Sequence, residues 1–151
     1  MRNLFNPAFC GLLTHRALKG YEEVEPYGMP FSLSLLVLPL ALHGDTRKEL
    51  QSHPRTRLLS ILEQSHLTLG FDERARSILP LAHEGFTLLA LRHCIEVSED
   101  GKLKTVARRM RSVIGETEET QDCLDAAKRI GKEFARIGDR ATIYTALGVR
   151  P

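Results

Sequence analysis

Hydrophobic residues recur at helical spacing in the first part of the chain. Asn6 followed by Pro7 is typical of a helix start, with an N-cap residue before a proline in the first turn. The apolar residues that then follow at intervals of three or four, up to Gly20, are Phe9, Leu12, Leu13 and Ala17. The pattern predicts a helix over residues 7–19.

The most apolar stretch of the chain is FSLSLLVLPLALH, residues 31–43. Pro30 stands at the favoured start of a helix, and Pro39 is expected to end or kink it. We therefore expect a buried helix over residues 31–38, at the centre of the core. The stretch is too short for a membrane-spanning helix, which needs about twenty apolar residues.

Two shorter patterns and a longer one indicate helices in the middle of the chain. Asp45 is a candidate N-cap for a helix over residues 45–51, and Pro54 precedes a helical pattern over residues 55–65. A longer pattern over residues 71–93 is apolar on more than one side after its first two turns, which is typical of a core helix.

The end of the chain predicts two more helices. Residues 118–137 carry an apolar stripe on one side, and Gly138 follows as a C-terminal stop. Asp139 is then a candidate N-cap for a last short helix over residues 140–147.

The stretch CIEVSEDGKLKTV, residues 94–106, predicts a β-hairpin. A two-residue turn at Asp100 and Gly101 would place polar and apolar side chains on the same face. A three-residue loop with Gly101 in the left-handed conformation instead pairs Ile95 with Thr105, Glu96 with Lys104, and Val97 with Leu103. We therefore expect the three-residue loop, with Ile95, Val97 and Leu103 buried.

Length and composition fit one compact domain, residues 1–151, of mainly α fold. The chain has 151 residues, of which 42% are apolar and 26% charged, enough to bury a sizeable core. Cys10, Cys94 and Cys123 are far apart and odd in number, which argues against a disulfide framework or a zinc site. We expect no signal peptide and a cytoplasmic location.

A cluster of basic residues lies in and after the predicted hairpin. Short helix, helix, longer helix and hairpin is the order of elements in a winged-helix unit, in which the hairpin is the wing. The candidate contacts to DNA phosphates are Lys102, Lys104, Arg108, Arg109 and Arg111. The longer helix carries Leu, Phe and Ala on its central face, and such side chains are poorly suited to reading base edges in a groove of DNA. The net charge of +2 gives no further support for DNA binding.

Motifs for catalysis are not found in the sequence. The six histidines are scattered without metal-ligand spacing, and there is no glycine-rich phosphate loop or nucleophile elbow. Adjacent acids at Glu118 and Glu119 fit a helix N-terminus, and those at Glu22 and Glu23 fall in a polar segment. We expect a protein without catalytic residues, metal or cofactor.

Three stretches together resemble a known family. They are NPAFCGLLTHRALKGY, GMPFSLSLLVLPLALHGDTRKELQ and KEFARIGDRATIYTALGVRP, and they cover nearly the whole chain in the expected order. Together they resemble the small middle component of bacterial three-component ABC systems. The family looks related to the Lamassu type of anti-phage and anti-plasmid defence.

The resemblance implies a non-enzymatic adaptor. Its implied partners are a large coiled-coil ABC ATPase of the SMC or Rad50 type and an effector subunit, often a nuclease, with DNA reached through the complex. From the residues alone, a stand-alone winged-helix DNA-binding regulator is the alternative. No membrane contact is expected.

The two ends of the chain are candidates for partner docking. The apolar residues concerned are Phe9, Ile143, Tyr144, Leu147 and Val149. Such residues near a terminus either fold back on the domain or dock in a groove of the ATPase.

Overall fold

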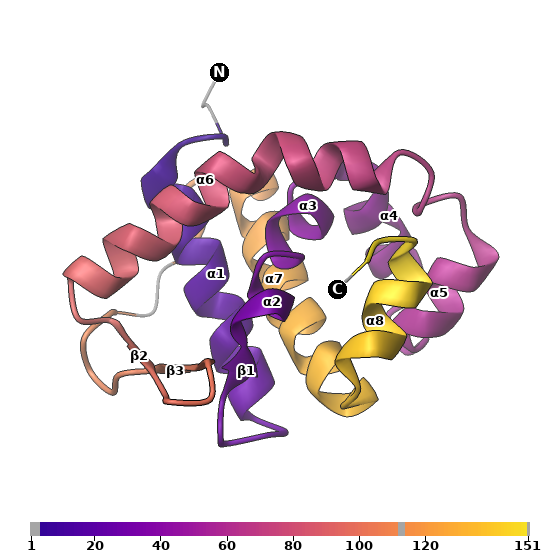
Figure 1. The fold of residues 1–151 in the computed structure, drawn as a ribbon. Coiled ribbons are helices and arrows are strands. Elements are labelled where there is room, and N and C mark those ends of the chain that lie inside the picture. The colour runs from indigo at the N-terminus through magenta and orange to yellow at the C-terminus, as the bar shows by residue number, and fades with distance from the viewer. Residues whose placement is uncertain (1–3, 112–113, 151) are drawn as a thin grey trace.

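The computed structural model describes residues 4–111 and 114–150 (Figure 1). The mainly α fold expected from the sequence is confirmed, with a small antiparallel sheet in the strand order β1-β3-β2. The longer helices are α1 (Pro7–Glu22), α6 (Phe71–Leu91) and α7 (Glu118–Ile137). The shorter ones are α2 (Phe31–Ser34), α3 (Val37–Ala41), α4 (Gly44–Ser52), α5 (Leu58–Gln64) and α8 (Arg140–Leu147). The strands are β1 (Met29–Pro30), β2 (Ile95–Val97) and β3 (Lys102–Thr105).

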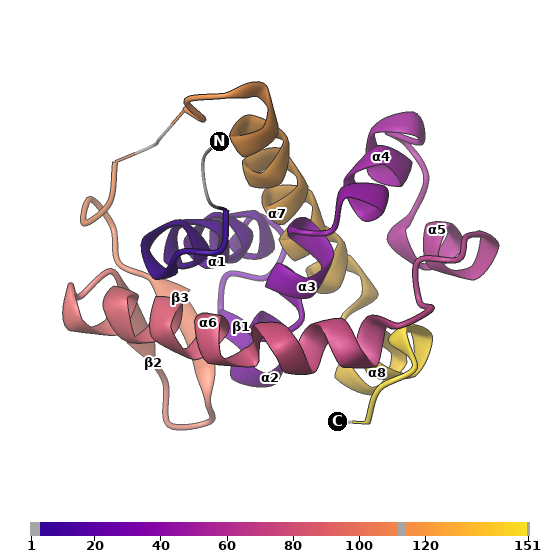
Figure 2. The ribbon, with the colours of Figure 1, turned by 90° about the horizontal axis from the view of Figure 1, so that it is seen from above.

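Helix α1 is the centre of the fold. The side chain of Asn6 caps it by accepting a hydrogen bond of 2.8 Å from the Phe9 backbone N–H, and Pro7 follows as expected. Figure 2 shows α1 between α6 on one side and α7 on the other. It is consequently buried on several sides and carries much of the core.

Glycines let α1 approach both neighbouring helices closely. A Cβ at Gly20 would overlap the Lys128 carbonyl of α7, and a Cβ at Gly131 would overlap the Ala17 carbonyl of α1. On the other side, Gly11 and Gly85 face each other, and a Cβ at Gly85 would lie 2.8 Å from the Gly11 nitrogen. Gly20 therefore serves helix packing, and the predicted end of α1 at residue 19 is wrong.

The apolar stretch after β1 forms two short helices, α2 and α3, in place of the single predicted helix over residues 31–38. The break falls at Leu35 and Leu36, and the Ser34 hydroxyl donates to the Phe31 carbonyl at 2.6 Å. The expected helix end at Pro39 is wrong, because Pro39 lies in the first turn of α3, where its missing N–H is not needed. All five residues of α3 are buried, so the expected position in the core is confirmed.

The starts of α4 and α5 differ from the prediction. His43, not Asp45, is the N-cap of α4, and its Nδ1 lies 2.9 Å from the Thr46 hydroxyl. Helix α5 begins only at Leu58, because residues 53–57 form a turn, and it ends at Gln64. The Arg129 guanidinium of α7 holds that turn by donating to the carbonyls of His53 and Thr56.

Helix α6 ends at Leu91, two residues before the predicted end. His93 adopts a left-handed backbone conformation with φ of 57°, which stops the helix. The Cys94 N–H then donates to the Leu89 carbonyl at 2.9 Å and closes the helix end.

The predicted hairpin register is confirmed. Ile95 pairs with Thr105, Glu96 with Lys104 and Val97 with Leu103, and Gly101 is left-handed with φ of 79°. Ile95 and Leu103 are buried as expected, but Val97 is 56% exposed, so its predicted burial is wrong. The reason is that β3 is the central strand, paired also with β1, whereas Val97 ends an edge strand near the hairpin tip. Strand β1 was missed because residues 21–30 carry turn-forming signals.

Candidate partner-binding site

The five basic residues predicted to contact phosphates lie in two groups. Lys102 and Lys104 alternate along β3 with the buried Leu103, so they leave the sheet on the face away from α1. The three arginines, Arg108, Arg109 and Arg111, follow the strand in the segment that leads toward α7. Contact of either group with DNA stays a prediction.

Acidic neighbours reduce the positive potential of the β3 lysines. The Lys102 ammonium lies 3.7 Å from the Asp100 carboxylate. Lys104 stands opposite Glu96 in the register of the hairpin. This group therefore carries less free charge than the sequence suggests.

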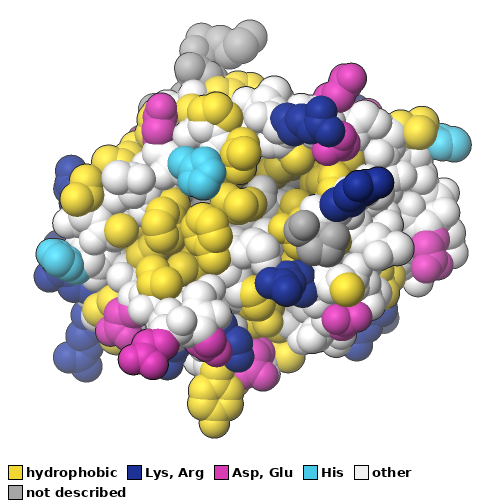
Figure 3. Space-filling model, in the orientation of Figure 1, with side chains coloured by type: hydrophobic (Ala, Val, Ile, Leu, Met, Phe, Trp, Pro, Cys, Tyr) yellow, Lys and Arg dark blue, Asp and Glu magenta, His cyan; other side chains and the backbone are white. Residues whose placement is uncertain are grey.

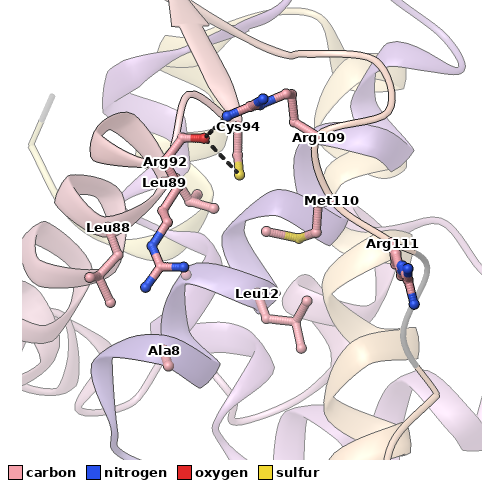
Figure 4. A pocket seen from close by; sticks show the side chains of 10 residues that line it. Ala8, Leu12, Leu88, Leu89, Arg92, Cys94, Arg109, Met110 and Arg111 are labelled. Carbon is pink, nitrogen blue, oxygen red and sulfur yellow. Dashed lines mark hydrogen bonds between the residues drawn. The ribbon is translucent and has the colours of Figure 1, made fainter.

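Arg109 and Arg111 of the second group, but not Arg108, border a pocket of about 610 Å³ between α1, α6 and the segment after β3. Figure 4 shows Leu88 and Arg92 extending from the α6 side, Arg109, Met110 and Arg111 on the opposite side, and Leu12 and Ala8 on α1. The pocket is also lined by Gly11, Leu89 and Cys94. It combines an apolar lining with three guanidinium groups.

No carboxylate offsets the charge of this pocket. Its lining includes no Asp or Glu. Within residues 4–111 and 114–150, none of Arg92, Arg109 and Arg111 forms an ion pair. Unpaired positive charge and apolar surface therefore coincide in this pocket.

Hydrogen bonds hold the two sides of the pocket together. The Arg109 guanidinium donates to the Arg92 carbonyl at 3.1 Å, and the Cys94 thiol donates to the same carbonyl at 3.7 Å (Figure 4). Arg108 precedes this contact in a left-handed conformation with φ of 64°, which is uncommon for a residue other than glycine. The segment is therefore tied to the end of α6.

Glu22 anchors the strand from which the segment departs. Its carboxylate accepts from the Thr105 backbone N–H at 2.6 Å and from the Thr105 hydroxyl at 2.7 Å. The sequence did not reveal this role, because Glu22 resembled a loop acid and its partner is 83 positions away. No local spacing signal marks such a contact.

Cys10, on α1, is fully buried and is not among the residues that line the pocket. Burial, and secondarily the charge of Glu84, raises the pKa of the Cys10 thiol to about 11. The thiol is therefore protonated at neutral pH. Burial likewise raises the pKa of Cys123.

The predicted docking residues at the C-terminus lie in the core. Ile143, Tyr144 and Leu147 are buried, and the Tyr144 hydroxyl donates to the Ser32 carbonyl at 2.7 Å. Of the two arrangements considered, the structure shows the one in which α8 folds back on the domain. Phe9 and Val149 are half-buried against the core. Docking through the three buried side chains would require α8 to leave its place.

Hydrophobic side chains also gather on the face shown in Figure 3, over the region of α2 and α6. Phe31 and Phe86 form an edge-to-face pair with ring centroids 5.1 Å apart, and His83 lies 6.3 Å from Phe31. These rings stabilise the contact between α2 and α6 and are partly exposed.

The residues that the structure describes include neither a metal-binding cluster nor a membrane-spanning helix. No group of three or more His, Cys, Asp and Glu side chains there is arranged to hold a metal ion. Among the same residues, no helix has the length and apolar character to cross a membrane.

Comparison with known proteins gives one match, which spans the chain. The family model for the "ABC-three component (ABC-3C) system Middle Component 3" matches residues 1–151. No curated protein and no solved structure matches the chain.

Proposed function

Since the chain belongs to the Middle Component 3 family of ABC-three component (ABC-3C) systems, we propose that it is a single-domain, non-enzymatic adaptor in such a system. In this role it binds an ABC ATPase of the SMC or Rad50 type in the cytoplasm and couples it to an effector subunit such as a nuclease. The complex defends the cell against phages and plasmids, and reaches DNA mainly through the ATPase. The match over residues 1–151 is the observation that carries the proposal.

The structure supports an adaptor by what its surfaces offer. The unpaired arginines around the pocket and the partly exposed rings on α2 and α6 are chemically suited to protein contacts, where Arg and aromatic residues are enriched. The Cys10 and Cys123 thiols give no support for nucleophilic catalysis, because burial raises the pKa of both.

The stand-alone winged-helix regulator has less support. Helix α6, which would read DNA, carries the acidic residues Asp72 and Glu73 in its first turn. Its Arg76 is already paired with Asp72 at 2.6 Å. These charges disfavour close approach to phosphates.

Co-purification with the ATPase tests the adaptor role. The tagged chain is co-expressed with the ATPase encoded beside it, and the eluate is passed through a sizing column. We expect a stoichiometric complex, and loss of phage or plasmid restriction when the gene is deleted. A chain that elutes alone and binds a specific DNA sequence tightly would favour the regulator.

A further inference from the structure

The pocket between α1 and α6 has the size and lining of a ligand site. Its volume of about 610 Å³ lies within the range of about 300–1,000 Å³ that is typical of such sites. Leu12 and Met110 supply flexible aliphatic surface, and methionine adapts its shape to varied apolar groups. One or two apolar side chains of a ligand would fit between them.

The guanidinium groups around the pocket favour binding of an anionic ligand. Arg92 comes from the end of α6, whereas Arg109 and Arg111 come from the segment after β3. Each planar guanidinium can donate two parallel hydrogen bonds to one carboxylate. Three like charges without a counter-charge repel one another, so carboxylates placed among them would be favoured.

The pocket is pre-organised for such a ligand. The bond from Arg109 to the Arg92 carbonyl joins its two sides, and the Cys94 N–H bond to the Leu89 carbonyl closes the helix end beside it. A site that is already ordered loses less conformational entropy on binding than a flexible loop does.

We propose that this pocket binds an acidic peptide segment with an apolar anchor residue, contributed by a partner component. The apolar residue contacts Leu12, Leu88 and Met110, while flanking Asp or Glu side chains pair with the arginines. The source of the peptide rests on the adaptor function proposed above, but its chemistry follows from the pocket.

Nucleic acid fits the pocket less well than a peptide. Single-stranded nucleic acid is bound by stacking of bases on aromatic rings, and the ten lining residues include no Phe, Tyr, Trp or His. An aliphatic floor instead accepts aliphatic or aromatic side chains of a peptide.

Selection from a random peptide library tests the proposal on the isolated full-length chain. Display of twelve-residue peptides should enrich sequences that combine two or more Asp or Glu with a large apolar residue. An enriched peptide, labelled with fluorescein, is then titrated with the protein by fluorescence anisotropy. Absence of enrichment, or enrichment of sequences without acids, would overturn the proposal.

Matched variants tie the binding to the pocket. The triple variant R92Q/R109Q/R111Q should bind the labelled peptide about 100-fold more weakly than the parent does, as expected for the loss of three charge pairs. The control K48Q/R55Q/R150Q removes the same charge from exposed residues outside the pocket and should bind within about three-fold of the parent. If both variants lost the same affinity, net charge alone would explain the effect, and the proposed binding site would be wrong.

Three further measurements separate the remaining outcomes. The single variant R111Q touches no hydrogen bond of the described fold, so it should keep the parent melting temperature and still lose about five-fold in affinity. A single-stranded oligonucleotide that displaces the peptide at lower concentration than the unlabelled peptide does would reassign the pocket to nucleic acid. If the chain co-purifies with the ATPase but selects no acidic peptide, the adaptor function would stand and only the pocket proposal would be wrong.

Discussion

Leu103 and Val97 face each other across the hairpin but differ in environment. Leu103 is fully buried on the central strand, whereas Val97 is 56% exposed at the edge. Period-two alternation correctly placed both on one face, but it cannot show how far the neighbouring helices cover that face. Coverage depends on α1 packing against β3, which is a contact distant in sequence.

The difference predicts unequal effects of one substitution. Leu103→Asp should lower the free energy of unfolding by about 4 kcal/mol, because it buries an unpaired charge. Val97→Asp should cost less than about 1 kcal/mol, since its side chain is largely exposed. Urea denaturation of both variants measures this, and equal costs would contradict the burial of the central strand.

Glu133 is a buried carboxylate whose partners come from two places in the chain. It accepts from the Leu58 N–H at 2.8 Å and from the guanidinium groups of Arg57 and Arg136 at 3.2 and 3.0 Å. Burial alone would raise the pKa of Glu133, but these donors outweigh it and the net pKa is lowered. Ionised Glu133 therefore stabilises the folded state above the ordinary Glu pKa.

We expect this stabilisation to disappear on acidification. As pH falls from the ordinary Glu pKa through the lowered folded pKa, Glu133 must take up a proton, which the unfolded chain does more readily. Glu133→Gln should cost about 2 kcal/mol at pH 7 and flatten the loss of stability below about pH 4.5. Denaturation curves from pH 7 to 3 measure this, with the exposed Glu63→Gln as the control. If the stability of Glu133→Gln fell with pH as steeply as that of the parent, the role of Glu133 would be contradicted.

At the scale of elements, the crossing of α1 and α7 depends on glycine. The Cβ of an alanine at residue 131 would overlap the Ala17 carbonyl, and backbone cannot yield as a flexible side chain can. Gly131→Ala should therefore destabilise the protein by about 3 kcal/mol, as in overpacked cores. Gly44→Ala, with its nearest atom 3.7 Å away at the end of the Arg47 side chain, should be neutral or slightly stabilising. Thermal melts of both variants test this, and similar melting temperatures would argue against close helix contact.

Helix α8 behaves as a core element. Removing residues 140–151 would expose the surfaces now covered by Ile143, Tyr144 and Leu147. We expect the truncated chain to lose its cooperative melt, whereas Tyr144→Phe, which loses only the bond to Ser32, should cost about 1 kcal/mol. A truncated chain that melts normally but no longer binds the ATPase would instead assign α8 to an interface.

At the scale of the whole molecule, the two basic groups should have separate effects. Changing Lys102 and Lys104 to Gln should lower the slope of log affinity against log salt by up to about 1.8 for DNA binding of the assembled complex, if both contact phosphates. Changing Arg109 and Arg111 to Gln should weaken assembly and leave that slope unchanged. Salt titrations and co-purification of the two variants measure these effects, and a common loss of both properties would contradict separate surfaces.

Local features of the fold were predictable, and long-range ones were not. Capping at Asn6, the stop at Gly138 and the register around Gly101 depend on residues close in sequence, and the structure has all three. The pocket needs residues from α1, α6 and the segment after β3, so its arginines were recognised only as a basic cluster. Arg92 was missed because it stands alone in the sequence, and the role of Gly20 was misjudged because its partner is on α7.

The position of α1 between α6 and α7 also bears on how the protein is made. Its first neighbour is completed at residue 91 and its second only at residue 137, although α1 itself ends at residue 22. At about 5–20 residues per second, a ribosome needs roughly 6–23 seconds to synthesise the intervening chain. During that time the apolar sides of a nascent α1 have no permanent cover, and contacts so distant in sequence also form slowly. Newly made chains should therefore depend on chaperones that bind short apolar helices, until the arrival of α7 encloses α1 and releases them.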